Sequence, residues 1–145
     1  MTHVAIARDW LALFCGAQGL GTLVVDLNRT HATNPLWMRH ARFHLVWQAT
    51  SYAFLSLVEI ALVLIPGPFQ QHRFYLTVLL ASIPMFAFFA ALIGRRFYGG
   101  ALSDPNGIPP ARIVAFGAER EIDLSVAAEV LALLMLLAIV TLFAH

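Results

Sequence analysis

The sequence predicts an all-α fold in which one integral membrane domain, residues 1–145, forms a bundle of four transmembrane helices. Composition is the first observation: 60% of the residues are hydrophobic, only 12% are charged, and the mean hydropathy is +0.77. Soluble globular domains carry roughly 25% charged residues. The second observation is a set of apolar runs close to the ~20 residues that a helix needs to cross a bilayer. These runs cover residues 10–25, 43–65, 74–93 and 124–144.

The ends of these runs and their prolines shape the expected helices. The first run is the shortest, so we expect its helix to begin near Ile6, with Trp10 at the membrane interface. Pro66-Gly67-Pro68 ends the second helix and makes the second and third helices pack antiparallel. Pro84 lies within the third run and is expected to kink that helix, because the Leu80 carbonyl loses its usual partner.

Small residues and the amino terminus complete this reading. Gly16, Gly19 and Gly21 permit a neighbouring helix to approach the first helix closely, so we interpret them as packing positions. The single cysteine, Cys15, excludes an intramolecular disulfide and is interpreted as a small packed side chain. A cleaved signal peptide is not expected, because no basic segment precedes a short apolar core and a small-residue cleavage site.

The arginines predict the orientation. All nine basic residues are arginine, and only Arg8 and Arg73 lie outside the first and third connectors. Cytoplasmic connectors are enriched in basic residues, so both connectors are expected to face the cytoplasm, with both termini outward. We expect a multi-pass protein of the cytoplasmic membrane of a bacterium. The seven arginines of the two connectors are Arg29, Arg39, Arg42, Arg95, Arg96, Arg112 and Arg120.

Half of the six histidines lie in one short stretch, from Thr30 to His44. Asn34-Pro35 marks a turn, and the residues that follow it favour a helix. His40 and His44 are four residues apart and therefore share one helix face. His31 lies in the connector, within reach of that face. We expect these three imidazoles to converge on one centre at the cytoplasmic mouth of the bundle.

Carboxylates are predicted beside the histidines. Asp26 ends the first helix, and Glu121 and Glu129 lie at the start of the fourth. Ionisable groups in a span are costly and usually face a bundle interior, so they are candidate functional residues. Glu59 is excluded from this centre, because it lies about 22 Å further along its helix than His44.

The segment from Asp26 to His44 reads DLNRTHATNPLWMRHARFH. It resembles the signature of a family of small four-helix membrane proteins from bacteria and fungi, in which an acidic residue is followed by Asn, Thr-His, Asn-Pro, Trp and His-Ala-Arg-Phe-His. The segment from Phe97 to Pro105 resembles the third connector of the same family. The chain departs from the family at Met38-Arg39, where the family often has two prolines, so a less rigid connector is expected. Because no activity is known for the family, the resemblance implies the architecture and the site but no reaction.

A metal-dependent membrane enzyme is the first functional hypothesis. Imidazole and carboxylate ligands suit a transition metal ion such as iron, zinc or copper. The eight-histidine set of lipid desaturases is absent, which argues against that family. The candidate ligands are His31, His40, His44, Asp26 and Glu121, and the candidate catalytic residues are His44, Glu129 and Asp26.

Two alternatives remain open. One is a metal-free isomerase or cyclase, in which a histidine or carboxyl group transfers a proton on an isoprenoid or sterol-like substrate. The other is an accessory subunit of a larger membrane complex. An apolar bundle favours a lipid-soluble ligand, nothing indicates nucleic-acid binding, and a homo-oligomer is compatible with the small polar surface. The candidate substrate-binding residues are Trp47, Gln48, Tyr52 and Phe88.

The third connector is predicted to act as a lid. Asp104-Pro105-Asn106-Gly107 has the residues of a tight turn, and Gly99-Gly100 could serve as a hinge.

Overall fold

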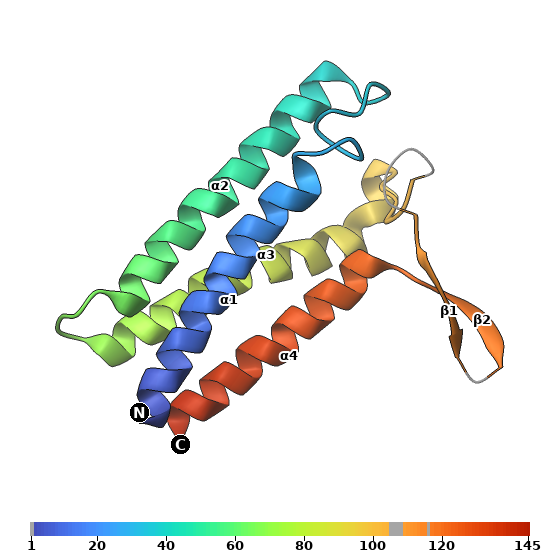
Figure 1. Ribbon diagram of the computed structural model, residues 1–145. Helices are drawn as coiled ribbons and strands as arrows, with labels where there is room; N and C mark the ends of the chain where they lie inside the picture. Colours follow the sequence, from blue (N-terminus) through green and yellow to red (C-terminus); the bar gives the residue numbers. More distant parts are fainter. Residues whose placement is uncertain (1, 105–108, 116) are drawn as a thin grey trace.

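Four helices and one short β-hairpin make up the fold (Figure 1). The computed structural model describes residues 2–104, 109–115 and 117–145. The four predicted helices are confirmed, and the hairpin is a small exception to the all-α prediction. In chain order the elements are α1 (His3–Asp26), α2 (Arg39–Leu64), α3 (Gln70–Tyr98), β1 (Ala111–Ala115), β2 (Ala118–Ile122) and α4 (Leu124–Ala144).

Within the described part of the chain, three helices are long and apolar enough to cross a membrane: α2, α3 and α4. The prediction of an integral membrane protein is supported by these three. α1 does not qualify, because Arg8 and Asp9 interrupt its first third and Gln18 adds a polar group near its middle. The prediction of four membrane-crossing helices is therefore supported for three of them.

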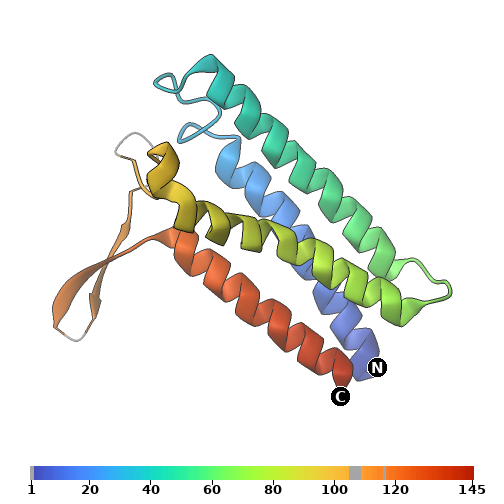
Figure 2. The ribbon, with the colours of Figure 1, turned by 180° about the vertical axis from the view of Figure 1, so that it is seen from behind.

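The helices form an up-and-down bundle. α1 packs along α2 and α4, α2 packs along α3, and α3 packs along α4. Both termini and the loop between α2 and α3 lie at one end, while the first and third connectors lie at the other (Figures 1 and 2). The seven connector arginines thus share one end of the bundle, as the sequence predicts.

The two remaining arginines bind the carboxyl end of α2. Pro66 and Pro68 follow that end, and the last carbonyls of a helix can accept side-chain donors; the Ala61 carbonyl also accepts from the Ile65 amide at 3.1 Å. The Arg8 guanidinium donates to the Val63 carbonyl, with an Nε–O distance of 3.1 Å, and Arg73 donates to the Ala61 carbonyl at 3.1 Å. Positive charge also stabilises a helix carboxyl end.

α3 continues through Pro84 as one helix. Pro84 cannot donate to the Leu80 carbonyl. Next to that position, the Gln18 side-chain amide donates to the Ala81 carbonyl at 3.1 Å. Gln18 therefore links α1 to α3 at the proline, which explains a polar residue in the middle of α1.

The third connector holds the hairpin where the sequence analysis expected a lid. Gly99 ends α3 in the left-handed conformation, with φ of +70°, so it terminates the helix. A Cβ atom on Gly100 would lie 2.3 Å from the Tyr98 ring, so a larger residue there would displace the tyrosine. The predicted turn at 104–107 lies mostly outside the described residues.

Gly19 on α1 marks a close approach between α1 and α2. A Cβ atom there would lie 2.6 Å from Ser56 Cβ and 3.4 Å from the Ala53 backbone of α2. The predicted packing role is thus confirmed for Gly19. It is not seen for Gly21, beside which a Cβ atom would meet nothing within 4 Å.

Gly19→Ala is expected to lower the free energy of unfolding by roughly 1–3 kcal/mol, because the new methyl group forces α1 and α2 apart. Gly21→Ala is the matched control and should raise it by about 0.5–1 kcal/mol, through helix propensity alone. Thermal unfolding in detergent, followed by circular dichroism, measures both. Equal effects of the two substitutions would contradict the close approach at Gly19.

Candidate functional site

The connector between α1 and α2 is held by its own polar side chains. Asn28 Oδ1 accepts from the Thr30 amide at 2.8 Å, and Asn34 Oδ1 accepts from the Leu36 amide at 3.0 Å. Asn34 is only 4% exposed, and its side-chain amide also donates to the Thr30 carbonyl at 3.3 Å. These bonds give the connector a defined shape, and His31 lies within it.

His31 is placed next to Asp26. Its Nδ1 atom lies 2.7 Å from Thr30 Oγ1, and the edge of its ring meets Trp37, with 5.2 Å between ring centroids. Asp26 lies just beyond the first predicted span. Burial raises the pKa of its carboxyl, and the positive charge of His31 opposes that rise. These residues form the first pair of candidate site residues, Asp26 and His31.

His40 and His44 form a second pair on the first turns of α2. Their Nε2 atoms lie 3.0 Å apart, and their rings meet edge to face with centroids 4.4 Å apart. The predicted i, i+4 contact is therefore confirmed. At this distance the two nitrogens form a hydrogen bond when one of them carries a proton and the other is bare, so the pair is placed to share one proton.

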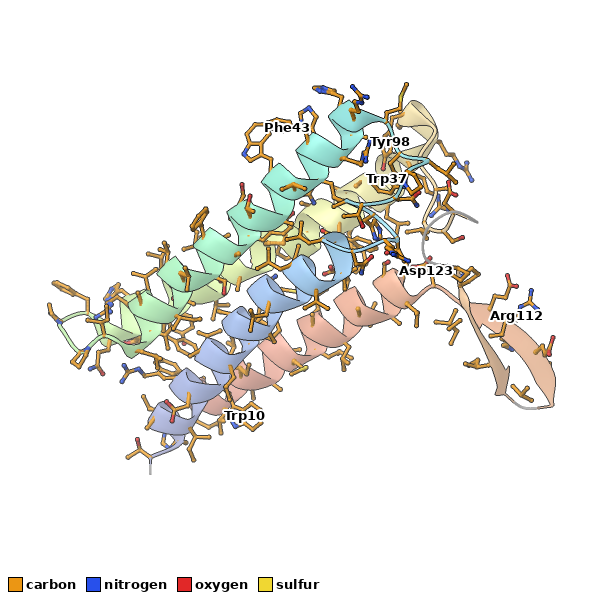
Figure 3. All side chains as sticks on the ribbon, turned by 45° about the horizontal axis from the view of Figure 1, so that its top comes forward. Trp10, Trp37, Phe43, Tyr98, Arg112 and Asp123 are labelled. Carbon is orange, nitrogen blue, oxygen red and sulfur yellow. The ribbon has the colours of Figure 1, made fainter. Side chains whose placement is uncertain are left out.

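Aromatic residues surround the second pair. The centroids of Phe43 and Trp47 lie 6.0 Å and 5.8 Å from that of His44. Phe43 is 64% exposed and projects outward from α2 (Figure 3). Of the other predicted substrate-binding residues, Gln48 is exposed one turn beyond His44, and Tyr52 is half-buried one turn further along. Phe88 belongs to a separate hollow of about 160 Å³ at the end of α3.

The predicted single centre is not present in the described part of the chain. No three His, Cys, Asp or Glu side chains there are grouped so that they could hold one metal ion. Glu121 lies on β2, where its Oε1 is 3.4 Å from Arg112 Nε. Glu129 is half-buried on α4. The structure thus divides the candidate residues into two pairs and two separate carboxylates.

The rotation of α2 about its axis explains this correction. The buried residues of α2 are Ala49, Ser56, Glu59 and Val63. At 100° per residue, His40 lies about 180° round the helix from Ala49. From their spacing and the short connector, the three histidines were expected to converge at the cytoplasmic mouth of the bundle, whereas the structure exposes His40 and His44 on the outer face of α2.

Glu59, excluded from the predicted centre, is the most deeply buried carboxyl group described. It is 1% exposed and lies beside Cys15, which is 0% exposed. Its Oε1 atom has no hydrogen-bond partner among the described residues. Next to it, Ser56 donates to the Cys15 carbonyl at 2.7 Å. The nearby arginines, Arg8 and Arg73, bind carbonyls of α2 instead.

The packing role predicted for Cys15 is confirmed by its burial, but its contact with Glu59 was not predicted. A sequence signal for Glu59 existed, since it is the only acidic residue in the second apolar run. Carboxyl groups inside a membrane span are uncommon and often functional. Which helix face it occupies follows only from the packing of α2 on α1.

No protein-family model matches the chain, and no match was found among curated proteins or solved structures.

Glu59→Leu is expected to raise the free energy of unfolding by about 1–3 kcal/mol, because it removes a buried oxygen that has no partner. Ser56→Ala at the same helix contact should lower it by about 1 kcal/mol, through loss of a satisfied hydrogen bond. Thermal unfolding of both variants in detergent is the measurement. A Glu59→Leu variant less stable than Ser56→Ala would show that the carboxyl group supports the packing.

Proposed function

We propose that this chain is an integral membrane enzyme that acts on a lipid-soluble substrate at the His40–His44 pair. The observation that carries the proposal is the 3.0 Å separation of the two Nε2 atoms, exposed beside Phe43 and Trp47. When the pair carries one additional proton, an imidazolium and a neutral imidazole lie side by side and provide a general acid and a general base together.

All four helices cross the membrane in this proposal, including α1. α1 has 24 residues and is therefore about 36 Å long, enough for a hydrocarbon core of roughly 30 Å. It packs along two helices that are themselves candidate spans, α2 and α4. Those neighbours cover Leu11 and Cys15, and Gln18 binds the backbone of α3, so its polar group does not face lipid.

The arginine-rich end of the bundle faces the cytoplasm in this arrangement. Single cysteines at Thr33 and Glu119 should then resist a membrane-impermeant maleimide in intact cells, whereas one at Gln71 should react. Cys15 is fully buried and gives no background. Reaction at Thr33 and protection at Gln71 would reverse the orientation, and opposite results at Thr33 and Glu119 would contradict the four-span arrangement.

The setting of the pair favours a substrate that arrives from the lipid. The histidines lie on the outer surface of α2, where the helix leaves the apolar region. Trp and Phe side chains at such a depth contact both acyl chains and headgroups. An apolar molecule with one polar group could hold its apolar part against Trp47 and present the polar group to His44.

A bound transition metal ion is the second candidate mechanism. The two Nε2 atoms lie 3.0 Å apart on one face of α2, so both imidazoles could bind the same ion. His40 and His44 would hold the ion, leaving its other positions to water and substrate. Iron, zinc and copper all accept such ligands, and the ion would act as a Lewis acid.

His40→Ala and His44→Ala should each abolish activity, because each removes one half of a proton-transferring or metal-binding pair. The assay is mass spectrometry of lipid extracts from cells that produce the wild type or a variant. His72→Ala is the matched control, since His72 is exposed at the opposite end of the bundle. The wild-type extract should differ from both pair variants and match the control.

Identical extracts from all four strains would contradict the proposed enzyme. Metal analysis of the purified wild type separates the two mechanisms. A stoichiometric metal that is absent from both pair variants supports the metal mechanism, whereas active protein without metal supports acid–base transfer.

A further inference from the structure

Among the described residues, the hairpin of β1 and β2 is a two-stranded sheet that makes no extensive contact with a helix (Figures 1 and 3). Isolated hairpins of this size are only marginally stable in water. Each described residue of β2 is exposed. A hairpin of this kind gains stability when one of its faces lies on another surface.

The strand register gives the hairpin two unlike faces. Arg112 pairs with Glu121 and Val114 with Glu119, so three of the four side chains on this face are charged. Ala111 pairs with Ile122 and Ile113 with Arg120 on the other face, which also carries Ala118. That second face is apolar apart from Arg120. We name it the Ile113 face.

The position of the hairpin indicates which surface the Ile113 face meets. The hairpin leaves the bundle beyond α3 and leads directly into α4, two of the candidate spans. It runs crosswise to the helices in both views (Figures 1 and 3). If the helices cross a bilayer, the strands lie roughly parallel to the bilayer surface, at the end of the bundle that carries seven arginines.

A hollow of about 540 Å³ lies where the hairpin meets α4. Glu121, Ile122 and Asp123 border it at the hairpin end, and the apolar residues Val126, Val130 and Leu134 continue it along α4. Apart from the two carboxylates at the hairpin end, the lining of this hollow is apolar. Acyl chains of neighbouring lipids would fill this space when headgroups lie beside the hairpin.

We propose that residues 111–122 are a lipid-surface anchor, in which the Ile113 face lies in the interface of the bilayer and Arg120 reaches lipid phosphates. This inference rests on the proposed membrane crossing. Arginine at such a depth extends its charged end to the headgroups while its stem stays in apolar surroundings. A second protein is a poorer occupant, because five side chains offer much less than the about 800 Å² per partner of a standard interface.

The test places an environment-sensitive NBD fluorophore on Ile113→Cys or on Val114→Cys, which lie on opposite faces. Each protein is placed in nanodiscs of phosphatidylcholine and phosphatidylglycerol, one copy per disc, with doxyl-labelled lipid as quencher. Cys15 is buried, and wild-type protein treated with the same fluorophore measures any labelling of Cys15. The label at position 113 should be quenched roughly twofold more strongly than the label at 114.

Equal quenching at the two positions would contradict the proposed anchor. A label at position 113 that is shielded from water but not quenched by lipid would also contradict it, because a protein contact would then cover the label. Leu134→Cys is the control for membrane crossing, since Leu134 is 59% exposed on α4. Quenching there by deep doxyl groups, without quenching at 113, rejects the anchor alone. No quenching at 134 rejects the membrane crossing itself.

Discussion

The close contact between α1 and α2 at Gly19 determines which ionisable side chains lie inside this bundle and which are exposed. Because Gly19 has no Cβ atom, Ser56 and the backbone of Ala53 approach α1 directly. That contact fixes the rotation of α2. Glu59 then lies against Cys15, and the residues about half a turn away, including His40, are exposed. A change in packing at Gly19 would rotate α2 and so change the surroundings of both Glu59 and His40.

The two faces of α2 differ in whether a substrate can reach their ionisable side chains. On the inner face Glu59 is 1% exposed and lies beside the Cys15 thiol, so a substrate reaches it only if the bundle opens. On the outer face His40 and His44 meet each other beside exposed aromatic rings. A lipid-soluble molecule can reach the second site without opening the bundle. This accessibility is why the proposed reaction is assigned to the histidines, although the buried carboxyl group is the more costly one to maintain.

Composition and apolar length were sufficient to predict four helices, since both are local properties of the chain. The last helix was predicted at its observed bounds, and α2 and α3 extend several residues past the apolar runs because polar residues continue their ends. The hairpin was missed: its strands are short and mixed in composition, and its clearest signal is Gly117, which adopts φ of +77°. The His40–His44 contact followed from helical spacing. The separation of His31 from this pair could not be predicted, because it depends on the rotation of α2, which distant residues on α1 set.

Solid-state NMR of protein with nitrogen-15-labelled histidine, in lipid bilayers, tests the central claim most directly. The account places the Nε2 atoms of His40 and His44 in one hydrogen bond, so a coupling between these two nitrogens should be observed and should vanish in His40→Ala. His72 should show no such coupling. Two uncoupled imidazoles at positions 40 and 44 in the wild-type protein would contradict the account, because no shared proton would then join them.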